Sequence, residues 1–292
     1  MATAVATAPL DPSAGRRRGQ VFIALAAVAW STAGVLQRQL SLDPATQVGG
    51  RALFAALALV GYVAIVERGG VGRAWRSIGL AGVALAVCLA AASCAFILAL
   101  NETTVARVLF IQAIAPVLAA LLARVLLGEP ISARTSIALA LALAGVAVML
   151  GAPGGGNATG DLLALVMALS FALALVITRH RRDVSMAPAT CLSQVLLMVA
   201  FLPFASLGDV GGEDLAVLVA LGAGQIALGL VFLTIGARLI PAAQVGLITL
   251  LEVVLGPLWV WLALDERPGT LTLVGGAVVV AAIVIQTSEG RS

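Results

Sequence analysis

Two stretches of this chain, offset by 137 residues, carry the same pattern. Residues 107–129 read RVLFIQAIAPVLAALLARVLLGE, and residues 244–266 read QVGLITLLEVVLGPLWVWLALDE. Aligned without a gap they share, among others, these pairs: Val108 with Val245, Ile111 with Ile248, Leu118 with Leu255 and Glu129 with Glu266. A proline follows the glutamate in both copies, at Pro130 and Pro268. The repetition predicts that the chain arose by internal duplication.

Two further matches occur in the same order at nearly the same offset. Residues 19–30 match residues 160–171, and both segments end in an aromatic residue, Trp30 or Phe171. The tripeptide Pro-Ala-Thr occurs at 44–46 and again at 188–190. Three matches in the same order support a duplication that covers most of the chain.

The composition places these repeats in a membrane. The chain is 61% hydrophobic and 11% charged, with a mean hydropathy of +1.11, whereas soluble domains are roughly 45–50% apolar and about 25% charged. Its apolar runs have the length of about 20 residues that a helix needs to cross the hydrocarbon core. Because lipid cannot satisfy backbone hydrogen bonds, these runs must be helices. The expected fold class is therefore an all-α integral membrane protein.

Breaks between the apolar runs predict ten transmembrane helices. Their expected ranges are 19–39, 45–66, 77–99, 103–127, 132–151, 160–179, 188–207, 214–236, 240–264 and 269–287. The predicted organisation is a disordered cytoplasmic tail at 1–18, a first five-helix repeat at 19–151, a linker at 152–159, a second five-helix repeat at 160–287 and a cytoplasmic tail at 288–292. The first fifteen residues are small and polar, so they do not resemble a signal peptide.

The arginines predict the orientation of the chain. All 17 basic residues are arginine. With the N-terminus in the cytoplasm, thirteen of them fall on the cytoplasmic side, and only Arg38, Arg51, Arg107 and Arg267 fall towards the outside. Since basic residues are retained in the cytoplasm, this asymmetry favours an even number of helices with both termini inside, in a bacterial inner membrane.

Five helices per repeat is an odd number, so the second copy must enter the membrane upside down. Inverted repeats of this kind are typical of secondary transporters, which place the substrate site near the bilayer midplane between the repeats. The Arg-rich loop after the sixth helix is cytoplasmic in this topology, and its counterpart after the first helix is external. Charge and duplication thus predict the same architecture.

Several other classes of protein lack support. The three cysteines lie scattered in apolar segments, which excludes a disulfide framework or a cysteine metal site. The single histidine, His180, falls in a predicted loop, outside the membrane region where a nucleophile would need a base. A chain without lysine has no Walker nucleotide motif. We expect no enzyme activity, no metal, no cofactor and no nucleic-acid partner.

The residues resemble a known family, the EamA-type members of the drug/metabolite transporter superfamily. The resemblance covers residues 19–287 and rests on the duplicated helix with a midspan turn and on five short motifs. These are Leu-Leu-Gly-Glu-Pro at 126–130, Leu-Asp-Glu-Arg-Pro at 264–268, Leu-Leu-Glu at 250–252, Ala-Trp at 29–30 and an arginine, Arg51, early in the second helix.

The resemblance implies a transporter of small solutes such as amino acids, other metabolites, sugar conjugates or toxic compounds, with many exporters among bacterial members. One departure from the family pattern is visible. Family copies often read Leu-Glu-Pro, but here the carboxylate, Glu252, is in the second half and the proline, Pro116, is in the first. The roles of the two halves therefore cannot simply be mirrored.

Glu252 is the strongest candidate for a functional residue. It is the one acidic residue of fourteen that falls at the centre of a predicted helix, and a charge there costs about 2.5–3.5 kcal/mol on insertion scales. Burial disfavours the charged form of a carboxyl group, so this position suits proton coupling or recognition of a cationic group. A protonated carboxyl group that only links two helices is the alternative. Helical spacing places a hydroxyl, an acid, a small residue and an aromatic wall on one face: Thr249, Glu252, Gly256 and Trp259.

Five other residues are considered for the predicted site, and the roles of some of them stay open. Gln112, whose carbonyl is freed by Pro116, is a candidate for the cavity wall. Trp30 and Ser31 fall midway along the first helix, where either a cavity or core packing accounts for them. Arg51 either snorkels to the interface or binds an anionic group of the substrate. Snorkelling is favoured for Arg107.

The sequence thus predicts a secondary transporter of a small-molecule substrate in the lipid bilayer, with export as the favoured direction and proton coupling as one option for its energy. The alternatives are a non-transporting membrane scaffold and a passive channel. A scaffold does not need a lone central carboxylate, and a channel usually shows rings of charge or a backbone-lined filter. The identity of the substrate, the direction and coupling of transport, and the oligomeric state stay open.

Overall fold

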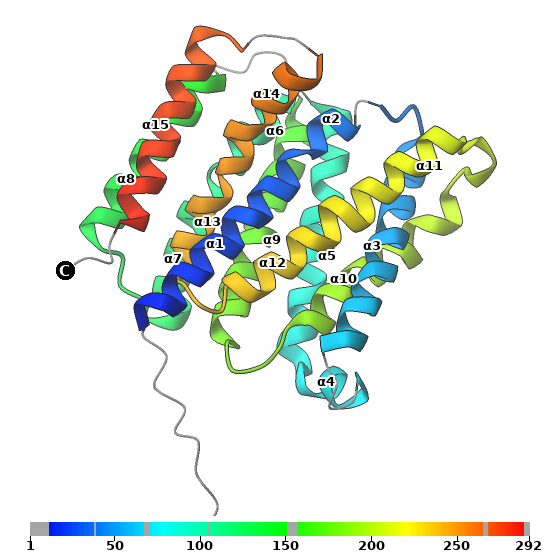
Figure 1. The fold of residues 1–292 in the computed structure, drawn as a ribbon, viewed down its shortest axis with the longest axis horizontal. Coiled ribbons are helices and arrows are strands. Elements are labelled where there is room, and N and C mark those ends of the chain that lie inside the picture. Colours follow the sequence, from blue (N-terminus) through cyan, green and yellow to red (C-terminus); the bar gives the residue numbers. More distant parts are fainter. Residues whose placement is uncertain are drawn as a thin grey trace, which may run out of the picture.

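A computed structural model of the chain describes residues 12–37, 39–66, 71–103, 105–150, 157–264 and 268–288. These residues contain only helices and their connections, with no strand. In chain order the elements are α1 (Pro12–Ser31), α2 (Ala33–Gln37), α3 (Pro44–Val66), α4 (Val71–Ser77), α5 (Gly79–Glu102), α6 (Val105–Gln112), α7 (Ala115–Leu127), α8 (Ala133–Leu150), α9 (Ala158–His180), α10 (Ala187–Phe201), two 3₁₀ turns (Leu202–Phe204 and Leu207–Asp209), α11 (Gly212–Val219), a π-helical segment (Ala220–Ala227), α12 (Leu228–Gly236), α13 (Ala242–Thr249), α14 (Leu251–Leu264) and α15 (Thr270–Thr287). Figure 1 shows their arrangement.

Ten of these helical segments, counted over the described residues, are long and apolar enough to cross a membrane. The prediction of an all-α membrane fold is therefore confirmed. Five spans are composite: α1 with α2, α6 with α7, α10 with the first 3₁₀ turn, α11 with the π-helical segment and α12, and α13 with α14. The sequence predicted a midspan turn only in the two duplicated spans, 103–127 and 240–264.

Two predicted boundaries differ from the structure. Helix α1 begins at Pro12, so the described part of the predicted disordered tail, residues 12–18, is helical. Asn157 caps α9, and its side-chain oxygen accepts a hydrogen bond from the backbone N–H of Gly160 at 2.7 Å. Because an N-cap starts a helix by satisfying a free N–H, α9 begins two residues before the end of the predicted linker. Residues 1–11, 151–156 and 289–292 lie outside the described residues, as do Arg38, Arg68, Arg267 and Arg291 of the arginine count.

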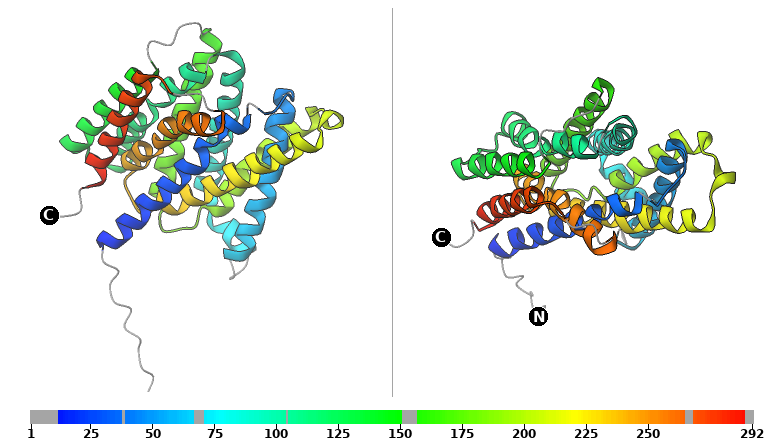
Figure 2. Two further views of the ribbon diagram at one scale, coloured as in Figure 1. Left: turned by 45° about the horizontal axis from the view of Figure 1, so that its top comes forward. Right: turned by 90° about the horizontal axis from the view of Figure 1, so that it is seen from above.

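Small residues allow the helices to approach closely. The helices α8 and α15 lie side by side, as Figures 1 and 2 show from three directions. At their contact, a Cβ added to Gly275 would lie 2.4 Å from the carbonyl oxygen of Gly145, and one added to Gly145 would lie 2.8 Å from that of Gly275. Membrane helices often associate through such small residues, because lipid supplies no hydrophobic force between them. Any larger residue here would push α8 and α15 apart.

Arginines gather at one end of the bundle, which we call the arginine-rich end. Arg179 of α9 forms an ion pair with Glu129 at 2.7 Å, and it donates to the carbonyl of Arg238 at 3.1 Å. Arg134 of α8 donates to the carbonyl of Ile285 near the end of α15. The start of α1, with Arg16, Arg17 and Arg18, lies at the same end, because Gly19 packs against Leu239 and Ile240.

Candidate functional site

Two spans are interrupted at equivalent points. Helix α6 ends at Gln112 and α13 ends at Thr249, and these residues differ by the same offset of 137 that relates the two copies in the sequence. Tight i→i−3 backbone bonds follow at both places, from the N–H of Ile114 to the carbonyl of Ile111 and from the N–H of Leu250 to that of Leu247. Short stretches of this geometry inside a helix often mark a functional hinge.

The two interruptions bring Gln112 and Glu252 together. Gln112 is the last residue of α6, and Glu252 lies in the first turn of α14. The side-chain Nε2 of Gln112 donates a hydrogen bond to Oε1 of Glu252, and both side chains are partly buried. The pair therefore connects the first half of the chain to the second at the point where each half breaks its helix.

Close backbone packing holds these broken helices against each other. A Cβ added to Gly246 in α13 would lie 2.9 Å from Cα of Pro116 in α7. Pro116 occupies the first turn of α7, where a proline is tolerated because its missing N–H has no helical partner to lose. Thus the proline of one half fits the glycine of the other, next to the pair of Gln112 and Glu252.

A second polar contact joins α1 and α14. The indole Nε1 of Trp259 donates a hydrogen bond to Oγ of Ser31 at 2.7 Å. The hydroxyl of Ser31 in turn donates to the carbonyl of Val28. Trp30, beside it, meets Phe171 edge to face and packs on Gly229, where an added Cβ would lie 2.0 Å from its Nε1. The predicted aromatic wall is therefore held in place by a hydrogen bond from Trp259 to the end of α1.

An open space separates the two polar contacts along α14. Gly256 lies one turn after Glu252 and one turn before Trp259, so the three residues share a face. A Cβ added to Gly256 would meet no described heavy atom within 4 Å, apart from the backbone of its own helix. The acid, the space and the indole thus form a row on α14 that faces α6 and α1.

Thr249 and Arg51 lie apart from this row. The break at Leu250 interrupts the helical spacing that aligned Thr249 with Glu252, and the hydroxyl of Thr249 donates to the carbonyl of Gly246 at 2.7 Å. Arg51 is 2% exposed, and its Nη2 donates to Oγ of Ser93 in α5 at 2.7 Å. A side chain so deeply buried does not reach the interface, which excludes snorkelling for Arg51. Anion binding stays a prediction.

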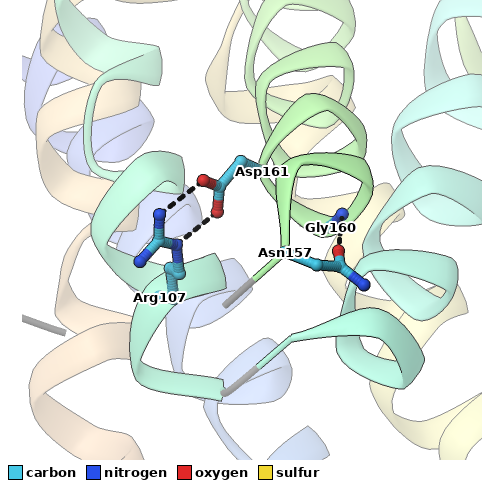
Figure 3. Close-up of polar contacts among 4 residues, drawn as sticks. All are labelled: Arg107, Asn157, Gly160 and Asp161. Carbon is cyan, nitrogen blue, oxygen red and sulfur yellow. Dashed lines mark hydrogen bonds and ion pairs between the residues drawn. The ribbon is translucent and has the colours of Figure 1, made fainter. Parts of the chain in front are cut away.

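An ion pair ties α6 to α9, as Figure 3 shows. Asp161 lies in the first turn of α9 and Arg179 in its last turn, so the pair is at the end opposite the arginine-rich end. Arg107 makes two hydrogen bonds to the carboxylate of Asp161, from Nε to Oδ1 and from Nη2 to Oδ2 at 2.6 Å. The sequence favoured snorkelling for Arg107 and did not single out Asp161. Both residues sit at the outer ends of predicted spans. This shared depth in the membrane was the feature of the sequence from which their pairing could have been predicted.

Ten apolar helices, each long enough to cross a bilayer, define a multi-pass membrane protein. The sequence profile of the EamA-like transporter family matches two ranges of this chain, residues 17–151 and residues 158–288. The chain therefore belongs to the EamA-like transporter family, in agreement with the resemblance found in its motifs. The two matched ranges correspond closely to the two predicted repeats.

Two similar proteins cover nearly the whole chain. A protein of Archaeoglobus fulgidus named an uncharacterized transporter is 29% identical over 275 residues, which span 94% of this chain and 97% of that protein. A protein of known crystal structure shares 21% sequence identity and a TM-score of 0.80, covering 93% of this chain and 97% of its own. At that level of identity the second likeness concerns the fold alone.

Proposed function

We propose that this protein is a secondary transporter that exports small metabolites, such as amino acids and related compounds, or drug-like solutes, across a bacterial inner membrane. The space beside Gly256 is the observation that carries the proposal. It lies on α14 between a carboxyl group and an indole, next to a helix break, and two residues of the first half, Gln112 and Ser31, bond to these two groups. Transporters built from repeats bind their substrates at such interrupted helices between the halves.

Glu252 is the proposed coupling residue. Its carboxyl group is partly buried at a helix break, and its one described hydrogen-bond donor is the neutral amide of Gln112. An ionisable group at this depth is a functional candidate by default, because it costs free energy to insert. We assign Glu252 to the binding and release of a proton, with Gln112, Trp259, Trp30 and Ser31 around the solute. Thr249 and Arg51 are assigned less direct roles in the walls.

The arginine-rich end is the proposed cytoplasmic end. Among the described residues, eleven arginines lie in or beside the loops at this end, and two, Arg51 and Arg107, lie towards the other. The positive-inside rule then places both termini in the cytoplasm. In this orientation the ion pair of Arg107 with Asp161 closes the outer side, and alternating access requires that it opens when the solute leaves.

A reconstitution experiment tests transport and coupling together. The purified chain is placed in proteoliposomes that contain a pH-sensitive dye, and gradients of amino acids, polyamines and amphipathic cations are imposed. We expect a solute to drive proton flux in the parent and not in Glu252→Gln, which keeps an acceptor for Gln112. Equal solute movement in both would make Glu252 structural and the protein a facilitator or exchanger. No movement of any solute in the parent would contradict the transport proposal itself.

A further inference from the structure

A cavity of about 160 Å³, lined by polar and apolar residues, lies at the arginine-rich end, separate from the space beside Gly256. A single water needs only about 10–15 Å³ measured in this way, so a small organic group fits. The cavity is distant from the candidate site around Glu252. Gln244 in α13 comes eight residues before Glu252, and a rise of 1.5 Å per residue separates the two backbone positions by about 12 Å along the span. Both halves contribute to the walls, whose polar residues are Arg16, Glu129, Ser132, Thr135, Gln244 and Gln286.

Two deeply buried glutamines in this wall have unused acceptors. Gln244 is 1% exposed and Gln286 is 4% exposed. Their Nε2 groups are bonded, that of Gln244 to the carbonyl of Gln286 at 3.3 Å and that of Gln286 to Oγ1 of Thr135 at 3.2 Å. Their Oε1 atoms have no hydrogen-bond partner among the described residues. Because buried polar groups are nearly always hydrogen-bonded, we expect a ligand to supply a hydrogen-bond donor to these two oxygens.

The remaining polar groups define which donor fits. The carboxylate of Glu129 lines the same cavity and adds negative charge, although Arg179 binds its Oε1. A primary ammonium group offers three N–H donors and one positive charge, which suits two amide oxygens and a carboxylate. Arg16 also lines the cavity. Its guanidinium would repel a bare cation and would bind a carboxylate, so the wall matches a ligand with both groups.

The other end of the bundle lacks this arrangement. Gln244 occupies the position in the repeat that Arg107 occupies in the first half, and Gln20 corresponds to Asp161. Arg107 and Asp161 bind each other, whereas the amides of Gln20 and Gln244 donate instead to carbonyls near the end of α15. Thus a charged pair joins α6 and α9 at one end, while at the other end Gln244, whose side-chain oxygen has no partner among the described residues, borders the cavity.

We propose that this cavity is an entry site that binds a small zwitterionic amine of the α-amino acid type. The ammonium group lies against Gln244, Gln286 and Glu129, and the carboxylate lies against Arg16. The role as an entry site rests on the proposed function. Binding itself does not, because it is measured on the protein without any transport.

Equilibrium binding of tritiated L-alanine to the full chain in nanodiscs tests the site. We expect glycine, which keeps both charged groups, to compete better than ethylamine, which keeps only the ammonium group, or propionate, which keeps only the carboxylate. The double variant Gln244→Met/Gln286→Met preserves side-chain size and removes both acceptors, so alanine affinity should fall at least tenfold. Gln286→Glu should instead tighten ethylamine binding, a gain that a misfolded protein cannot produce.

Other outcomes would overturn the proposal. No binding of alanine, equal binding by the double variant, or competition by ethylamine or propionate as strong as that by glycine would overturn the proposal. Gly61→Ala serves as the control, because Gly61 in α3 is exposed with open space at its Cβ, and its alanine binding should match that of the parent. Alanine binding without transport of any solute would contradict the proposed function and support the binding site. Transport without binding at this cavity would support the proposed function and contradict the binding site.

Discussion

Trp30 of α1 and Phe171 of α9 contact each other edge to face, with ring centroids 5.8 Å apart and an interplanar angle of 74°. They are also the residues that end the matched segments 19–30 and 160–171 of the two halves. The predicted inverted repeat would place such a contact between equivalent residues near the axis that relates the two halves. The aromatic contact lies one residue along the chain from Ser31 and its bond to Trp259.

The fit of Trp30 depends on Gly229. An added Cβ would lie 2.0 Å from the indole nitrogen, so Gly229→Ala forces Trp30 out of its place. Overpacking of this kind costs about 1–3 kcal/mol, and we expect that loss in thermal unfolding in detergent. Gly224→Ala is the control, because a Cβ there meets no described heavy atom within 4 Å beyond its own helix. Equal stability of the two variants would show that Trp30 has room to move.

Gln112 and Glu252 should act as a unit. Gln112→Met removes the donor and Glu252→Met removes the acceptor of one hydrogen bond, so their effects on the free energy of unfolding should not add. Contacting residues show interaction energies of about 0.5–3 kcal/mol in double-mutant cycles. The cycle is measured by thermal unfolding of the parent, both single variants and the double variant. Additive effects would mean that the hydrogen bond contributes nothing measurable to the link between the halves.

The ion pair of Arg107 and Asp161 should control opening of the outer end. Its side chains are 28% and 31% exposed, so we expect only a small stability effect, of about 0–1 kcal/mol. Asp161→Asn should nevertheless increase labelling of a cysteine placed at Thr103 by an impermeant maleimide. The exchanged pair Arg107→Asp/Asp161→Arg should return labelling toward that of the parent. Labelling that stays constant across all variants would show that this pair does not gate the outer end.

Much of the fold could be predicted from the sequence, because membrane spans are long apolar runs with clear breaks. The duplicated pattern also paired Gln112 with Thr249, and the structure ends a helix at each of these residues. Side-chain partners could not be predicted in the same way. Gln112 and Glu252 lie 140 residues apart, and their contact depends on how α6 and α14 rotate and cross, which apolar composition does not specify.

The failures have specific physical causes. Thr249 was aligned with Glu252 by assuming an unbroken helix, but the turn at Leu250 changes the direction of the side chains that follow. Arg107 was interpreted by itself, although a cation near hydrocarbon is most stable beside an opposite charge. A search for acids at the same depth in other spans would have found Asp161 in the first turn of α9.

Solute uptake by Gly256→Leu in proteoliposomes tests the central claim most directly, since that claim is that the space beside Gly256 is the path of the solute. The leucine side chain would fill the row between Glu252 and Trp259 without meeting described side chains at its Cβ. Gly61→Leu is the matched control, because Gly61 in α3 is exposed and also has open space. We predict that Gly256→Leu unfolds at the same temperature as Gly61→Leu and loses uptake at least tenfold, while Gly61→Leu transports like the parent. Uptake by Gly256→Leu at the rate of the parent would contradict the account.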